Sequence, residues 1–204
     1  MAEIECFYDC SSPWTYFAFV SLRRMQEEIG VTIQWRPFLV GGVFNAVNPS
    51  VYNSRDTPVP AKSAYSRKDQ QDWARHLGLS IHYRPSVFPV NSVKAMRACI
   101  VLAAEGRDVD FAAACFKAYW TDDKDISQVP VLTGICDGLG IDAGKLLAAI
   151  DQQPVKDTLR ANTTEAIERG AFGSPTMFVG GNDMYFGNDR MPLIRDAVIR
   201  LRAE

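Results

Sequence analysis

A strand, a helix and a second strand follow one another at the start of the chain, and this order most constrains the fold. Residues 3–9 form an apolar, strand-like run. Residues 13–29 carry apolar side chains three and four positions apart, the spacing of a helix with one buried face, and Gly30 ends the pattern. Residues 31–38 alternate and are rich in branched and aromatic side chains, which predicts a second strand. Such a β-α-β unit favours two parallel strands joined by a right-handed crossover.

The rest of the sequence predicts a helical block followed by a second group of strands. Glycines and prolines predict a loop over residues 41–60, and helical spacing then dominates up to residue 151. The remaining expected elements are a helix at 154–169, short strands at 176–179 and 184–186 around a turn, and a closing helix at 189–202.

Without the helical block, the order is β-α-β-α-β-β-α, which is typical of thioredoxin-like folds. We therefore expect an α/β chain with a large all-helical insertion. The expected division has residues 1–40 and 171–204 in the thioredoxin-like domain and residues 61–151 in the insertion, with 41–60 and 152–170 connecting them.

Composition excludes several classes of partner. The net charge is -2 with acids and bases mixed along the chain, so nucleic acid is not expected. No apolar run approaches the ~18 residues of a membrane span, and acidic residues near the N-terminus argue against a signal peptide. Five irregularly spaced cysteines and only two histidines predict a reduced, cytoplasmic protein without a metal site.

Ser12-Pro13 stands where the first strand meets the helix, the place at which thioredoxin-like folds carry Cys-x-x-Cys. Ser12 and Thr15 occupy the two cysteine positions, so the redox couple is absent. Capping alone explains serine followed by proline at a helix start. The same helix start also favours an anion, and a hydroxyl there can donate to the thiolate of a ligand such as glutathione. Both roles can hold, since Ser11 can cap the helix while Ser12 faces the ligand.

Ser174-Pro175 precedes the strand at 176–179. An ordinary turn explains this pair, because only ~5–6% of x-Pro bonds in folded proteins are cis. In a thioredoxin-like fold, however, a cis-proline lies opposite the helix start. The residue before it then offers its backbone N–H and C=O to an extended peptide, and glutathione is such a peptide.

Phe186, Gly187, Asn188 and Asp189 lead into the closing helix. Asn188 or Asp189 is an ordinary helix cap. In a functional interpretation, N–H groups of the helix start suit the γ-glutamyl carboxylate of glutathione and Asp189 suits its ammonium group. The three motifs together, in this order on this fold, are specific where each alone is weak.

The chain resembles the 2-hydroxychromene-2-carboxylate isomerases and the similar kappa-class glutathione transferases, both in the DsbA-type branch of the thioredoxin-like superfamily. The resemblance runs nearly end to end. The blocks that carry it are Phe7-Tyr8-Asp9 with Ser12-Pro13-x-x-Tyr16, Phe88-Pro89-Val90-Asn91-Ser92 with Ala95-Met96-Arg97, residues 170–176, and residues 186–191.

The resemblance implies the roles of individual residues. It makes Ser12 the catalytic serine, with glutathione as cosubstrate. The residues that it implies for glutathione binding are Ser12, Asn53, Ser174, Pro175, Phe186, Gly187, Asn188 and Asp189. Those that it implies for the second substrate, a small aromatic organic acid, are Asn53, Arg55 and Asn91. The Asn-Arg pair of the isomerases matches less cleanly here, because Ser54 separates Asn53 from Arg55.

The implied activity is the reversible, glutathione-dependent conversion of 2-hydroxychromene-2-carboxylate to trans-o-hydroxybenzylidenepyruvate in naphthalene breakdown, by a cytoplasmic homodimer. A kappa-like transferase or peroxidase is the nearest alternative and shares the glutathione residues. This fold also suits a thiol–disulfide oxidoreductase or a non-catalytic binding protein, and the missing cysteine pair argues against the oxidoreductase.

Overall fold

Four strands form one mixed sheet in the computed structural model, which describes residues 3–203 apart from the side chains of Ser54 and Arg55. The strands lie in the order β2-β1-β3-β4. Their bounds are β1 Ile4–Tyr8, β2 Ile33–Pro37, β3 Thr176–Val179 and β4 Asp183–Phe186. Strands β1 and β2 are parallel, while β3 is antiparallel to both β1 and β4. The expected β-α-β unit and C-terminal hairpin are therefore confirmed.

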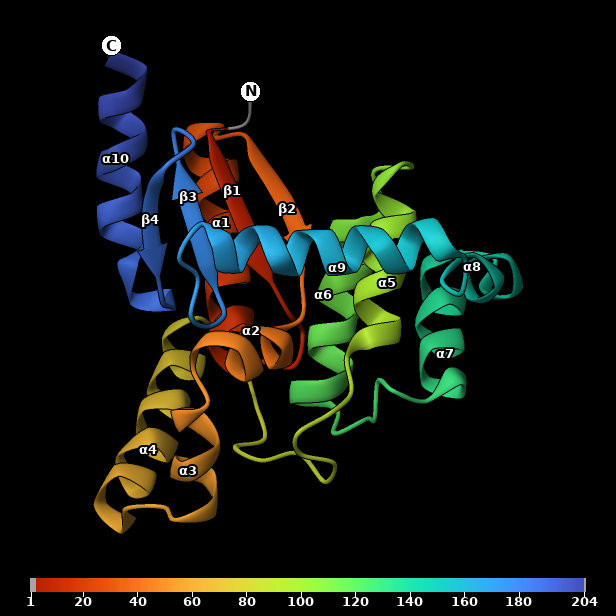
Figure 1. The fold of residues 1–204 in the computed structure, drawn as a ribbon, viewed down its shortest axis with the longest axis horizontal. Coiled ribbons are helices and arrows are strands. Elements are labelled where there is room, and N and C mark those ends of the chain that lie inside the picture. Colours follow the sequence, from red (N-terminus) through yellow and green to blue (C-terminus); the bar gives the residue numbers. More distant parts are fainter. Residues whose placement is uncertain (1–2, 204) are drawn as a thin grey trace.

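The helices lie on both faces of the sheet and beyond one of its edges. Figure 1 shows α9 crossing in front of the sheet and α5–α8 gathered beyond β2, with α3 and α4 projecting below. The α-helices are α1 Pro13–Ile29, α2 Val40–Val47, α3 Ser50–Asp56, α4 Pro60–His76, α5 Val93–Ala103, α6 Asp108–Phe116, α7 Val129–Leu139, α8 Ala143–Ala149, α9 Gln153–Glu168 and α10 Met191–Ala203. A π-helical turn, Lys117–Thr121, follows α6, and a 3-10 turn, Asn188–Arg190, precedes α10.

The expected loop over residues 41–60 is wrong, because α2 and α3 occupy most of it. Helix α2 buries Val40 and Val43, and Val43 packs in a small core with Phe7 and Phe38. This burial outweighs the poor helix propensity of the two glycines within it, since packing supplies most helix stability in proteins. Gly42 also permits close approach to α9: a Cβ there would lie 3.0 Å from Thr163 Cγ2.

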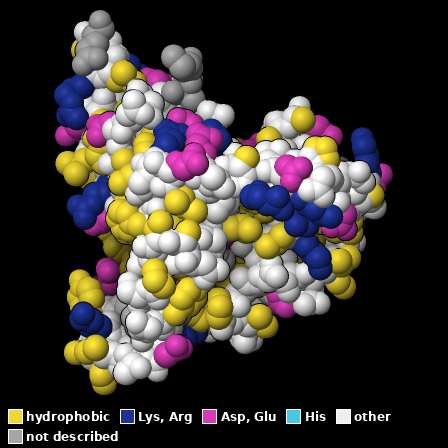
Figure 2. Space-filling model, in the orientation of Figure 1, with side chains coloured by type: hydrophobic (Ala, Val, Ile, Leu, Met, Phe, Trp, Pro, Cys, Tyr) yellow, Lys and Arg dark blue, Asp and Glu magenta, His cyan; other side chains and the backbone are white. Residues whose placement is uncertain are grey.

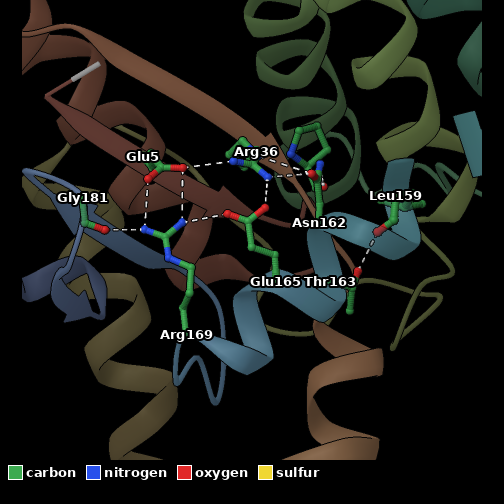
Figure 3. Close-up of polar contacts among 9 residues, drawn as sticks. Glu5, Arg36, Leu159, Asn162, Thr163, Glu165, Arg169 and Gly181 are labelled. Atoms are coloured by element: carbon green, nitrogen blue, oxygen red, sulfur yellow. Dashed lines mark hydrogen bonds and ion pairs between the residues drawn. The ribbon is translucent and has the colours of Figure 1, made fainter. Parts of the chain in front are cut away.

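A charged cluster fixes α9 to the face of the sheet opposite α1. Figure 3 shows Glu5 of β1 between the guanidinium groups of Arg36 and Arg169. Both arginines lie 3.0 Å from its carboxylate and also pair with Glu165. The Arg169 guanidinium lies 3.7 Å from the ring centroid of Phe178, where cation–π attraction adds to the ion pairs. These contacts are remote from the site described below and have a structural role.

The surface shows no segregation of charge on the face drawn in Figure 2, where acidic and basic side chains lie close together at several places. Across residues 3–203, no helix combines the length and the apolar character that crossing a membrane requires.

Candidate functional site

Two adjoining cavities lie where β1 ends and α1 begins. The smaller has a volume of about 600 Å³ and brings together Ser12, Ser174, Asn91 and Phe186. The larger, of about 900 Å³, is described below. Three residues line both cavities: Pro13, Gln70 and Phe88. The two cavities therefore form one branched cleft at the N-terminus of α1.

Ser12 caps α1 with its own side chain. Its hydroxyl oxygen accepts a hydrogen bond from Thr15 N–H at 3.3 Å and donates one to the carbonyl oxygen of Ser174 at 3.2 Å. The alternative in which Ser11 caps the helix is not realised, because Ser12 is the N-cap residue and Ser11 donates its backbone N–H to Asp9. Capping and the approach to Ser174 are thus combined in the single hydroxyl of Ser12.

Asp9 is a buried carboxylate on which several helix starts converge. Its two oxygens accept hydrogen bonds from the N–H groups of Ser11 and Val40, at 2.9 and 3.0 Å. Burial raises the pKa of the Asp9 carboxyl, and hydrogen bonds from Ser11, Ser92 and Val40 oppose that rise. Since Asp9 ties the start of α1 to the starts of α2 and α5, it fixes the position of Ser12.

Ser174 contacts Ser12 directly, and both residues line the smaller cavity. The Ser174–Pro175 peptide bond is cis, as the thioredoxin-like pattern predicts. The Ser174 hydroxyl lies 2.7 Å from the hydroxyl of Thr15. Ser12 and Thr15, which occupy the two positions of a Cys-x-x-Cys motif, therefore both contact Ser174. Both contacts tie the segment before β3 to the first turn of α1.

Phe186 lies at the end of β4 and lines the smaller cavity, where its ring packs 4.4 Å from that of Phe172. The next residues, Gly187 to Asp189, line neither of the two cavities. Gly187 has a φ of 102°, and a Cβ there would lie 2.8 Å from a carboxylate oxygen of Asp189. The sequence predicts Asn188 or Asp189 as the cap of the closing helix. In the structure both residues belong to a 3-10 turn before that helix, and no side chain caps the turn.

Asn188 and Asp189 differ in exposure. The Asn188 side chain is buried, and its Nδ2 has no hydrogen-bond partner among the described residues. A buried donor without a partner is costly, and Asn188 lines neither of the two cavities, so its role in binding a ligand stays a prediction. Asp189 is half exposed and pairs with the neighbouring Arg190 at 3.3 Å.

The expected substrate residues are divided between the two cavities. Asn53 is exposed on α3 and lines the larger cavity. Asn91 lines the smaller one, where its side-chain oxygen accepts a hydrogen bond from Val93 N–H at the start of α5. Arg55 belongs to α3, but its side chain lies outside the described residues. The roles of Asn53, Arg55 and Asn91 in binding stay predictions.

The protein's own thiols do not serve this site. All five cysteines are free and buried, and none lines either cavity. Burial raises the pKa of Cys10, the nearest cysteine in sequence to Ser12, well above its ordinary value. Since a thiolate is the reactive form, a thiol reagent at Ser12 has to come from a ligand. Among residues 3–203, no group of three or more His, Cys, Asp or Glu side chains could hold a metal ion.

Sequence reasoning missed the role of Asp9 and the polar lining of the larger cavity. Asp9 carries a signal, since an acid at the end of a buried strand and next to a helix start is unusual. Gln70, Lys62 and Arg84 carry none, because single polar residues on a helix or loop are ordinary surface features. Only the fold brings these three together.

Comparisons with known proteins indicate what the whole chain is similar to. A 2-hydroxychromene-2-carboxylate isomerase from Pseudomonas putida is 29% identical over 202 residues, covering 97% of this chain and 95% of the relative. The Homo sapiens glutathione S-transferase kappa 1 is 28% identical over 203 residues, covering 94% and 88%.

A solved structure of a 2-hydroxychromene-2-carboxylate isomerase superposes with a TM-score of 0.84 at 25% identity, covering 98% of this chain and 95% of the other. The chain is thus similar over nearly its whole length to proteins named as isomerases and as glutathione transferases. The model of the DSBA-like thioredoxin domain matches residues 3–198. With nearly the whole chain inside that match, the protein belongs to the family of DSBA-like thioredoxin domains.

Proposed function

We propose that this protein is a glutathione-dependent isomerase that interconverts 2-hydroxychromene-2-carboxylate and trans-o-hydroxybenzylidenepyruvate, in the breakdown of aromatic compounds such as naphthalene. The observation that carries the proposal is the hydrogen bond between Ser12 and Ser174 in the wall of the smaller cavity, at a helix start that has no cysteine of its own. Similarity to isomerases over nearly the whole chain supports the choice of reaction.

The site residues fit glutathione. The backbone of Ser174, held by the cis bond to Pro175, offers the edge along which an extended peptide can bind. The Asp189 carboxylate is half exposed, which suits the ammonium group of the γ-glutamyl end. When bound, glutathione would supply a thiolate that adds reversibly to a conjugated double bond and makes it single while it rotates.

Ser12 holds one hydroxyl proton, which it donates to Ser174 C=O. If a peptide N–H of the ligand bound this carbonyl oxygen instead, the Ser12 hydroxyl would be free to donate its hydrogen bond to the glutathione sulfur. The N-terminus of α1 stabilises negative charge at the same place. Ser12 and the helix start would together favour thiolate over thiol at neutral pH.

A kappa-like transferase or peroxidase is the second candidate, because relatives named as kappa transferases match at 28% identity over 94–95% of this chain. It would use the same glutathione residues. In either case we propose a cytoplasmic enzyme that acts as a homodimer, a state that light scattering of the purified protein tests directly.

The decisive experiment compares two assays on dialysed enzyme. Isomerisation of 2-hydroxychromene-2-carboxylate should be absent without glutathione, appear on its addition and ignore chelators. Conjugation of glutathione to a neutral electrophile should be slow by comparison. Full isomerase activity without a thiol would overturn the proposal, while conjugation or peroxidase activity alone would favour the transferase.

A further inference from the structure

The larger cavity is built from polar and aromatic side chains that the glutathione motifs leave unexplained. It has a volume of about 900 Å³ and lies between α3, α4 and the segment before α5. Lys62 and Arg84 line it, as do the aromatic rings of Tyr83, Phe88 and Trp120. Such a lining suits a flat ring that carries an anionic group.

Gln70 stands at the junction of the two cavities, because it lines both of them. Its side chain is only 7% exposed, and its Oε1 has no hydrogen-bond partner among the described residues. Its Nε2 lies 3.4 Å from Ser66 Oγ, which is a long hydrogen bond. Since a buried carbonyl without a donor is costly, the position is suited to a ligand that brings an O–H or N–H group.

Arg84 is placed to meet a carboxylate. Its guanidinium lies 5.8 Å from the ring centroids of both Tyr83 and Phe88. Contact with two rings limits the motion of the planar group and preserves its hydrogen-bonding edge. The ion pairs found among the described residues include neither Arg84 nor Lys62. Among the residues that the structure describes, the lining of this cavity contains one acidic residue, Asp56, against the two cations Lys62 and Arg84, so its balance of charge favours an anion.

We propose that the larger cavity is the binding site of the second substrate, a hydroxylated aromatic acid, and that Gln70 and Arg84 determine its specificity. Gln70 accepts a hydrogen bond from the hydroxyl group, and Arg84, with Lys62 nearby, binds the carboxylate. The ring then lies among Tyr83, Phe88 and Trp120, and the double bond between the ring and the carboxylate lies beside the junction, where a thiolate held at Ser12 can reach it. This inference rests on the proposed function, which supplies the reaction in which the second substrate takes part.

Equilibrium binding tests the site without turnover. The probe is trans-2-hydroxycinnamate, a stable hydroxylated aromatic acid, and tryptophan fluorescence follows it because Trp120 lines the cavity. Cinnamate lacks the hydroxyl group, and 2-hydroxycinnamide lacks the charge. Gln70→Met should weaken binding of the hydroxy acid about fivefold and leave cinnamate nearly unchanged. Arg84→Gln should weaken both acids about fivefold, more at low salt, and spare the amide.

Two control variants match these changes outside the cavity lining. Gln71 is adjacent on α4 and its Nε2 donates to Ile81 C=O. Arg67 lies 4.9 Å from the ring centroid of Tyr83 but does not line the cavity. Gln71→Met and Arg67→Gln should therefore leave the affinity for all three probes unchanged. Gln70→Met should also leave the melting temperature unchanged or higher, because the acceptor that it removes has no partner.

Equal losses for all three probes in Gln70→Met or Arg84→Gln would overturn the inference, as would failure of the wild-type protein to bind the hydroxy acid. These outcomes are distinct from failure of the proposed function. If the hydroxy acid binds with the predicted discrimination but glutathione-dependent turnover is absent, the site stands and the proposed isomerase activity falls.

Discussion

The Ser12 hydroxyl oxygen lies 3.2 Å from the Ser174 carbonyl oxygen, although 162 positions separate the two residues in the sequence. Ser12 is the cap residue directly before α1, and Ser174 lies in the segment before β3. The sheet brings them together because β1 and β3 are adjacent and antiparallel. A ligand that binds both groups therefore contacts the N-terminal β-α-β unit and the C-terminal segment at the same time.

Replacing Ser12 with alanine should lower glutathione-dependent turnover about 10²- to 10³-fold, the usual effect of losing one donor to a developing anion. Glutathione affinity should change little, while the ultraviolet absorbance of the bound thiolate should appear at higher pH. The lost cap should cost about 1 kcal/mol of stability. Unchanged turnover and titration would reduce Ser12 to a helix cap.

A matched control separates capping from chemistry in that experiment. Asp142 caps α8 in the same way, by accepting a hydrogen bond from Lys145 N–H at 2.9 Å. Asp142→Ala should therefore lower stability by a similar amount without changing turnover.

Gly173 leaves room for the ring of Phe186. A Cβ at position 173 would lie 2.7 Å from Phe186 Cε2, so Gly173→Ala should displace this ring from the smaller cavity. We expect the Michaelis constant for glutathione to rise severalfold, with a stability loss of about 1 kcal/mol because the ring is partly exposed and can move. A double-mutant cycle with Phe186→Leu checks the cause: the combined loss should be smaller than the sum of the single losses. Additive losses would show that the two residues act independently.

Periodic patterns predicted the sheet and most helices, because strands and amphipathic helices repeat their burial along the chain. They failed over residues 40–56, where the helicity of α2 depends on burial against Phe7 and Phe38 and is not encoded locally. The Ser12 and Ser174 motifs were recognisable because each combines a proline with a helix or strand boundary. Gln70 was not recognisable, since what singles it out is a buried Oε1 without a partner at the junction of two cavities.

Asp189→Asn should weaken glutathione binding about tenfold, because it removes a negative charge from the position proposed for the γ-glutamyl ammonium group. The melting temperature should hardly change, since the existing pair with Arg190 is half exposed and such pairs contribute little. Titration calorimetry with glutathione and a thermal melt measure both quantities. Arg190→Gln breaks the same ion pair but keeps the carboxylate, so glutathione affinity should persist in that variant. A lower melting temperature with unchanged affinity would make Asp189 structural.

Glu3 should make the stability of the fold depend on acid. A hydrogen bond from Arg202 is the main reason that the pKa of Glu3 falls from 4.5 to about 2, and Thr32 adds further hydrogen bonds. Because the folded-state pKa is lowered, the stabilisation is fully present above about pH 4.5 and is lost as the pH falls toward 2. Arg202 is exposed while Glu3 is half-buried, so solvent screens the pair from one side and its contribution is about 1 kcal/mol or less. Glu3→Gln should therefore be less stable than the wild type at pH 7, and the difference should shrink between pH 4.5 and 2.

Urea unfolding at pH 7, 5, 4 and 3 measures this difference directly, with an unchanged slope of free energy against urea as the check that both proteins unfold alike. The matched control is Glu27→Gln on the exposed face of α1, which should differ little from the wild type at every pH. The pair joins the residue before β1 to the end of α10, so it links the two ends of the described chain. A difference that stays constant from pH 7 to 3 would mean that Glu3 contributes through packing, and that the Arg202 contact does not lower its pKa.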